Sequence, residues 1–77
     1  MNIEEFINYE AGSGSENDVA YAKELRRAYS YYKDFPRGDV LIDALRDARE
    51  DNRRTNSSHR TTADCMIIHK LLMGDLK

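Results

Sequence analysis

The sequence predicts an all-α fold, a small bundle of three to four short helices. Three observations lead to this class. Apolar side chains recur every three or four residues, capping residues precede several of these segments, and no stretch alternates apolar and polar residues as a half-buried strand does. A chain of 77 residues has room for one small core, so we expect residues 1–77 to form a single domain. The expected helices cover about residues 3–10, 17–34, 40–51 and 62–73.

The first helix has a capping signal at its start. Asn2 and Glu5 have the spacing of a capping box, in which each residue satisfies a free backbone donor of the first turn. The apolar residues that follow share one helix face: Ile3, Phe6 and Ile7. Residues 11–16 are rich in glycine and serine, which predicts a flexible linker after this helix.

The second helix has the most regular pattern in the chain. Ser15 or Asn17 can cap it, and Pro36 with Gly38 predicts its end. One face is apolar and aromatic: Tyr21, Ala22, Leu25, Ala28, Tyr29 and Tyr32. The other face is largely basic: Lys23, Arg26, Arg27, Ser30 and Lys33. The first face is expected to pack on the core and the second to meet solvent.

The third and fourth helices are separated by a polar, basic stretch. Asp39 is a suitable N-cap for helix 40–51, whose apolar stripe is Leu41, Ala44, Leu45 and Ala48. Residues 52–60 contain no apolar residue and show no periodicity, which predicts an exposed basic loop. Thr61 or Thr62 is then expected to cap the last helix, and Gly74 to end it.

The last helix is apolar on most of its circumference. From Cys65 to Met73 only Lys70 is charged, and such a helix must be enclosed by its own chain or by another. Two arrangements satisfy this condition. The other helices can cover it within one subunit, or a partner or second copy can cover the side that carries Met66, Ile67 and Met73.

Composition narrows the classes of function. The chain has a net charge of −2, 40% apolar and 34% charged residues, as in a folded soluble domain. One cysteine permits no intrachain disulfide, which favours the cytoplasm, and no apolar run is long enough to cross a bilayer. Residues 1–18 carry five acidic side chains and no basic one, and this segment can either pair with basic segments within the fold or present an acidic arm to a basic partner.

Catalytic and metal-binding motifs are not found in the sequence. Cys65 and His69 are spaced i, i+4, and His59 precedes them, but structural zinc needs a fourth ligand. A thiol within an apolar stripe keeps a high pKa and is a poor nucleophile. We therefore expect no metal, no cofactor and no enzymatic activity.

A protein–protein interaction module is the function that these features favour. Tyr31 is expected to be exposed on the second helix among Arg27, Glu24 and Asp34, and an exposed tyrosine beside an arginine is common in binding hot spots. Arg26 and Arg27 belong to the basic face of the same helix, which could meet an acidic partner. Met66 and Met73 add apolar surface that can adapt to a partner. In size and style the chain resembles virus- or mobile-element-encoded inhibitors and adaptors of larger host proteins or nucleoproteins, such as anti-CRISPR and anti-restriction proteins.

The alternative is a small nucleic-acid-binding transcriptional regulator. It would use the basic face of the second helix and the expected loop with Arg53, Arg54, His59 and Arg60, which could contact phosphates. Two observations weigh against it. The sequence pI of about 5.6 is low for a nucleic-acid-binding domain, and the last helix lacks a polar face to read base edges.

Overall fold

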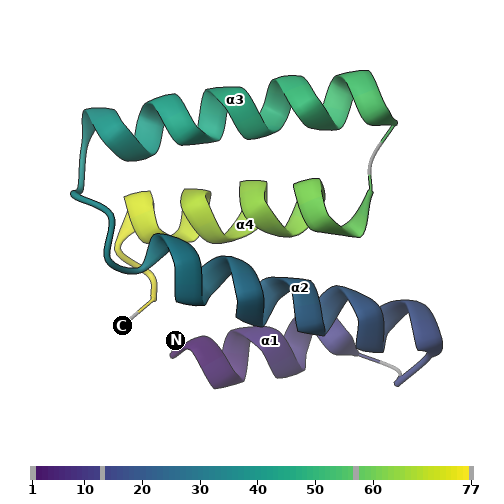
Figure 1. Cartoon of the computed structure of the whole chain (residues 1–77). Coiled ribbons are helices and arrows are strands. Elements are labelled where there is room, and N and C mark those ends of the chain that lie inside the picture. Colours follow the sequence, from purple (N-terminus) through teal and green to yellow (C-terminus); the bar gives the residue numbers. More distant parts are fainter. Residues whose placement is uncertain (1, 13, 57, 77) are drawn as a thin grey trace.

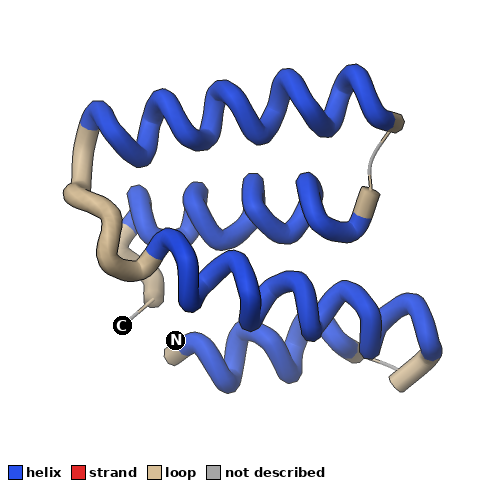
Figure 2. Tube along the Cα trace, viewed as in Figure 1, coloured by secondary structure: helices blue, strands red, loops and turns tan. Residues whose placement is uncertain are grey.

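The computed structural model describes residues 2–12, 14–56 and 58–76. Within these residues the chain forms four α-helices and no strand, which confirms the all-α prediction (Figures 1 and 2). The helices are α1 (Ile3–Ala11), α2 (Glu16–Tyr32), α3 (Asp39–Thr55) and α4 (His59–Met73).

The last helix, α4, is the centre of the bundle. α2 and α3 each pack against it, and α1 packs against α2 (Figure 1). Among the described residues, α2 and α3 pack on α4 rather than on each other. The bundle is consequently flat, with principal extents of 35 × 30 × 16 Å. This arrangement leaves the space between α2 and α3 open above α4.

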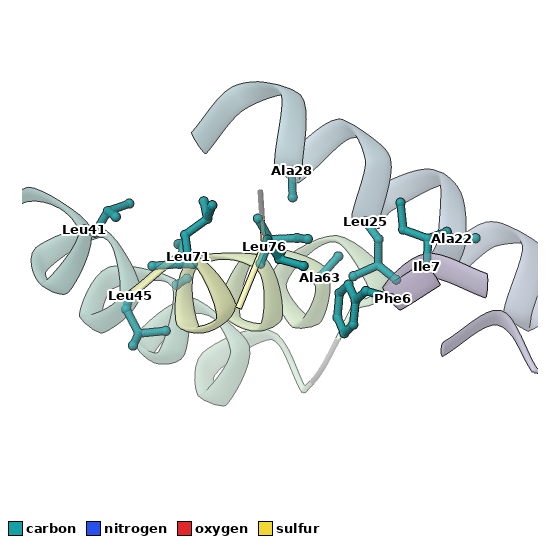
Figure 3. Close-up of a cluster of buried hydrophobic side chains, with 13 residues drawn as sticks. Phe6, Ile7, Ala22, Leu25, Ala28, Leu41, Leu45, Ala63, Leu71 and Leu76 are labelled. Atoms are coloured by element: carbon teal, nitrogen blue, oxygen red, sulfur yellow. The ribbon is translucent and has the colours of Figure 1, made fainter. Parts of the chain in front are cut away.

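The core is formed by the apolar stripes that the spacing predicts. Phe6 and Ile7 of α1 lie beside Leu25 of α2, and Leu41 of α3 lies near Leu71 of α4 (Figure 3). Each large apolar side chain buried in this way contributes about 1.5–3 kcal/mol through removal of its surface from water. The buried residues are Phe6, Ile7, Ala22, Leu25, Ala28, Leu41, Leu45, Ala48, Ala63, Ile67, Ile68, Leu71 and Leu76.

Most of the apolar surface of α4 is covered within the subunit. Ile67 and Ile68 are completely buried, so the expectation that Ile67 belongs to an uncovered side is wrong. The reason is that α2 and α3 both pack on α4, and their apolar stripes join α4 in one core cluster to which Phe6 and Ile7 of α1 also belong. Met66 is partly buried, while Met73 is 65% exposed. The uncovered apolar surface is therefore much smaller than the sequence suggests.

The predicted basic loop over residues 52–60 is wrong. α3 continues to Thr55 and α4 begins at His59, so the connection consists of residues 56–58, of which Ser57 lies outside the described residues. Apolar periodicity gives no sign of this extra helix because its last turns are fully polar. These turns contain exposed ion pairs spaced i, i+3, with Asp51 2.7 Å from Arg54 and Glu50 4.0 Å from Arg53.

The caps at this connection also differ from the prediction. Asn56 adopts a left-handed conformation with φ of 62° and ends α3. Ser58, and neither Thr61 nor Thr62, caps α4, since its hydroxyl accepts a hydrogen bond from the Thr61 backbone N–H at 3.3 Å. The cap lies earlier because the helix starts at His59, three residues before the predicted start at residue 62.

The remaining helix ends follow the sequence closely. The Asn2 side chain accepts from the Glu5 N–H at 2.8 Å and donates to the Glu5 carboxylate at 3.0 Å. Ser15 caps α2, and Gly74 ends α4 in a left-handed conformation. Gly38 rather than Asp39 is the N-cap of α3, because Asp39 already lies in the helix. α1 reaches Ala11 and α2 starts at Glu16, which shortens the expected 11–16 linker; Ser13 lies outside the described residues.

Candidate functional site

A hollow of about 250 Å³ opens between the C-terminal end of α2 and the middle of α3, with α4 at its base. We call it the α2–α3 groove. It exists because both helices pack on α4 and leave the space between them unfilled. Its lining residues are Tyr31 and Tyr32 of α2, Phe35 after α2, Ala44, Asp47, Ala48 and Asp51 of α3, and Thr61 and Asp64 of α4.

Three aromatic rings form one wall of this groove. The ring centroids of Tyr31 and Tyr32 are 4.8 Å apart with planes at 90°, and Phe35 lies 5.1 Å from Tyr31 and 5.0 Å from Tyr32. The three rings can meet because α2 ends at Tyr32 and the Phe35 N–H bonds the Tyr32 carbonyl at 3.0 Å. Tyr31 is nevertheless 60% exposed. The wall is thus braced by its own ring contacts and remains open to solvent.

The base of the groove is held by an ion pair between α2 and α4. Arg27 contacts Asp64 at 2.7 Å and Glu24 at 2.9 Å, and the Asp64 side chain is only 14% exposed. Burial opposes the charge of Arg27, but hydrogen bonds to Asp64 and Glu24 prevail and raise the pKa of the guanidinium. Burial, with a smaller contribution from Asp64, also raises the pKa of the Tyr32 phenol.

The opposite wall, on α3, carries two further carboxylates. Asp51 is paired with Arg54 at 2.7 Å, whereas the Asp47 side chain makes no ion pair or hydrogen bond within the described part of the chain. No lysine or arginine is among the described residues that line the groove. The charge of Arg60 partly opposes the rise in the pKa of Tyr32, but Arg60 does not line the groove. The surface offered to a ligand is aromatic on one side and acidic on the other.

A second hollow, of about 260 Å³, lies on another side of α4 and is lined by Arg49 of α3 with Thr62, Cys65, Met66 and His69 of α4. It unites the Cys65–His69 pair noted in the sequence. Burial raises the pKa of the Cys65 thiol, which keeps it protonated and weakly nucleophilic. Across the residues that the structure describes, no group of three or more His, Cys, Asp or Glu side chains is arranged to hold a metal ion.

The predicted partner-binding residues lie on different surfaces. Tyr31 lines the α2–α3 groove, Met66 lines the second hollow, and Met73 is exposed near the end of α4. Arg26 is exposed on α2. Arg27 was expected on an open basic face, but its guanidinium is committed to Asp64 because the α2–α4 packing brings the two together.

The residues predicted for phosphate binding lie at one end of the bundle, around the α3–α4 connection. Arg53 and Arg54 are in the last turn of α3, and His59 and Arg60 are in the first turn of α4. All four are exposed. The His59 ring lies 6.1 Å from the ring of Tyr21. The acidic partners of Arg53 and Arg54 reduce the positive charge that this end presents.

Of the nine residues that line the groove, the sequence predicts only Tyr31 as a binding residue; Tyr32, Phe35 and Asp47 are among the eight that it does not. The helical spacing places Tyr32 in the apolar stripe of the second helix, and Phe35 precedes the proline that marks the end of this helix. A usable signal is present, since Tyr31, Tyr32 and Phe35 are spaced to meet at a helix end, and Ala44, Asp47, Ala48 and Asp51 share one helix face. Helical periodicity does not predict that these faces of α2 and α3 lie opposite each other across α4.

Comparison with known proteins adds no functional information. No protein family, curated protein or solved structure matches this chain. Among the helices that the structure describes, none has the length and apolar character needed to cross a bilayer.

Proposed function

We propose that the protein is a small protein-binding module and that it engages its partner through the α2–α3 groove. The observation that carries the proposal is the exposed Tyr31, whose ring contacts those of Tyr32 and Phe35 in the wall of a hollow. Tyrosine gives a large contact area at low conformational cost, and binding energy concentrates where such a ring meets a concave surface.

The walls of the groove favour binding without a large rearrangement. The two helices that carry them are fixed on α4 by a continuous core, and the Arg27–Asp64 pair ties α2 to α4 beneath the aromatic wall. A preorganised surface spends less free energy on ordering when a partner binds. A single domain of 77 residues with such a surface suits an inhibitor or adaptor that docks on a larger protein.

A homodimer through α4 has less support than a groove-bound partner. Ile67 and Ile68 are buried within the subunit, and the apolar side chains left on that side are the exposed Met73 and the partly buried Met66. Stable interfaces bury about 1,200–2,000 Å² in total, which two such side chains per subunit do not supply. The uncovered apolar surface of α4 is therefore too small to form a stable dimer interface.

The nucleic-acid alternative also has less support. α4 lies between α2 and α3 along its length, so it cannot enter a DNA groove as a recognition helix (Figure 1). The remaining route, phosphate contact by Arg53, Arg54, His59 and Arg60, depends on two arginines that already have acidic neighbours. Filter binding to duplex and single-stranded DNA at low salt tests this route directly, because phosphate contacts are strongest there.

A comparative pull-down tests the proposed function. The immobilised wild-type protein and two variants, Tyr31→Ala and Tyr9→Ala, are incubated with a lysate of the cells from which the sequence derives. Tyr9 is a matched control because it is an exposed tyrosine on α1, outside the groove. Truncation of a hot-spot residue costs about 2 kcal/mol or more, which is about a thirtyfold loss of affinity.

The expected result is a protein retained by the wild type and by Tyr9→Ala but lost from Tyr31→Ala. Circular dichroism should show equal helicity for the three proteins, so that loss of binding is not loss of fold. A partner retained equally by all three would contradict binding through the groove.

A further inference from the structure

We infer that the α2–α3 groove receives an arginine side chain from the partner protein. This inference rests on the proposed function and adds the chemistry of the ligand. The aromatic and acidic residues of the lining attract a cation: the rings of Tyr31, Tyr32 and Phe35 through their π electrons, and the aspartates through their charge. Although the chain contains 12 lysines and arginines, none lines the groove among the described residues.

The distribution of ion pairs identifies the carboxylate that a ligand would use. Asp64 is already paired with Arg27 and Asp51 with Arg54. Asp47 lies on the same face of α3 as Asp51 and has no ion pair or hydrogen bond within the described residues. An incoming cation can therefore pair with Asp47 without displacing a residue of the protein.

The geometry favours a guanidinium over an ammonium group. A planar guanidinium stacks on an aromatic ring and can donate two parallel hydrogen bonds to one carboxylate, whereas the lysine ammonium is compact and strongly hydrated. The volume of about 250 Å³ is below the range of about 300–1,000 Å³ that is typical of pockets for drug-sized ligands. It suits one long side chain inserted from a partner surface.

Titration with short peptides, followed by ¹H–¹⁵N correlation spectra of the full chain, tests this inference. The probes are acetyl-Gly-Arg-Gly-amide and the same peptide with citrulline, which keeps the shape and loses the charge, or with lysine. The arginine peptide should shift the amide signals of Tyr31, Phe35 and Asp47. The citrulline peptide should leave them in place, and the lysine peptide should bind several-fold more weakly.

Paired variants assign the contacts. Asp47→Asn should weaken binding of the arginine peptide about tenfold, because a hydrogen bond between charged groups is lost. Glu50→Gln removes one charge from the same helix outside the groove and should have little effect. Tyr31→Leu should weaken binding about threefold through loss of the ring face, while Tyr31→Phe should keep the affinity. Dispersed spectra confirm that each variant is folded.

The outcomes separate this inference from the proposed function. Equal binding of the arginine and citrulline peptides, equal binding of the arginine and lysine peptides, or shifts confined to the acidic residues of α1 would overturn the arginine assignment. If the partner protein is lost from Tyr31→Ala but binds Asp47→Asn as well as wild type, the groove is the binding site and its ligand is not a cation. If Tyr31→Ala retains the partner, the proposed function fails, and this inference fails with it.

Discussion

Two hollows of nearly equal volume lie on different sides of α4, and they differ in chemistry. The α2–α3 groove, of about 250 Å³, is aromatic and acidic, with Tyr31, Phe35 and Asp47 in its walls. The second hollow, of about 260 Å³, has Cys65 and Met66 beside the cationic Arg49. The first is enclosed by three elements of the fold, and the second is formed by α3 and α4 alone.

Because the two volumes are so similar, the choice of the groove as the proposed binding site depends on its chemistry. The groove has a braced aromatic wall and an aspartate, Asp47, that is not used within the described structure. The second hollow has a thiol whose raised pKa keeps it neutral, and a methionine that partly packs on the core. The second hollow also has polar side chains, Arg49, Thr62 and His69, but it lacks the aromatic wall and the aspartates of the groove.

The largest expected effect concerns the helix that both hollows share. Ile68 is fully buried between the elements around α4, so Ile68→Ala should lower the free energy of unfolding by about 2–5 kcal/mol. Met73→Ala, on the exposed end of the same helix, should change it by less than about 0.5 kcal/mol. Urea denaturation followed by circular dichroism measures both values. Similar losses for the two variants would mean that α4 is not enclosed as described.

An intermediate effect is expected at the base of the groove. Asp64→Asn removes the partner of Arg27 in a partly buried ion pair. It should lower the free energy of unfolding by about 1–3 kcal/mol, which lies between the values for exposed and buried pairs. Asp43→Asn breaks an exposed i, i+3 pair with Arg46 at 3.4 Å and should cost at most about 0.5 kcal/mol. The same denaturation assay compares them. Equal costs would show that the Arg27–Asp64 pair does not hold the groove together.

The connection between α3 and α4 sets the relative position of the walls of both hollows. Ser58→Ala removes the N-cap of α4 and should destabilise the protein by about 1 kcal/mol. Ser30→Ala, at an exposed position within α2, is the control and should be neutral or slightly stabilising. Thermal unfolding of the two variants measures the difference. If Ser58→Ala leaves the thermal stability unchanged, Ser58 is not the N-cap of α4.

The smallest effect is expected in the second hollow and depends on pH. Burial raises the pKa of the Cys65 thiol, so the unfolded chain loses this proton at a lower pH than the folded protein does. The contribution of the thiol to stability is therefore fully present below the ordinary cysteine pKa and is lost as the pH rises above it, through the raised pKa of the folded state.

Cys65→Ala should reduce that loss, which urea unfolding at several pH values can measure. Tyr21 and Tyr32 also have raised pKa values, and their contribution persists in the variant at higher pH. An identical pH dependence for wild type and Cys65→Ala would show that the thiol is not protected in the second hollow.

Only some parts of this structure can be predicted from the sequence. The stripes with Leu25, Leu41 and Ile68 were predictable because burial of apolar residues follows helical periodicity. The cap at Asn2 and the end at Gly74 were predictable from local chemistry. The length of α3 was not, because its last turns up to Thr55 are polar and show no apolar periodicity.

The candidate site was predicted only at Tyr31. Its exposure follows from the position of this residue on α2, but its neighbours across the groove depend on how α2 and α3 pack on α4. Arg27 illustrates the same limit: the sequence places it on a basic face, and tertiary packing gives it Asp64 as a partner. Long-range pairing of helix faces is the information that one sequence lacks.

Site-specific photo-crosslinking tests the central claim most directly, because it asks which hollow the partner touches. Benzoylphenylalanine is introduced at position 31 in the groove, or at position 69 in the second hollow, and each protein is irradiated with the partner retained in the pull-down. The groove account predicts a covalent adduct from position 31 and none from position 69. An adduct from position 69 alone would contradict it.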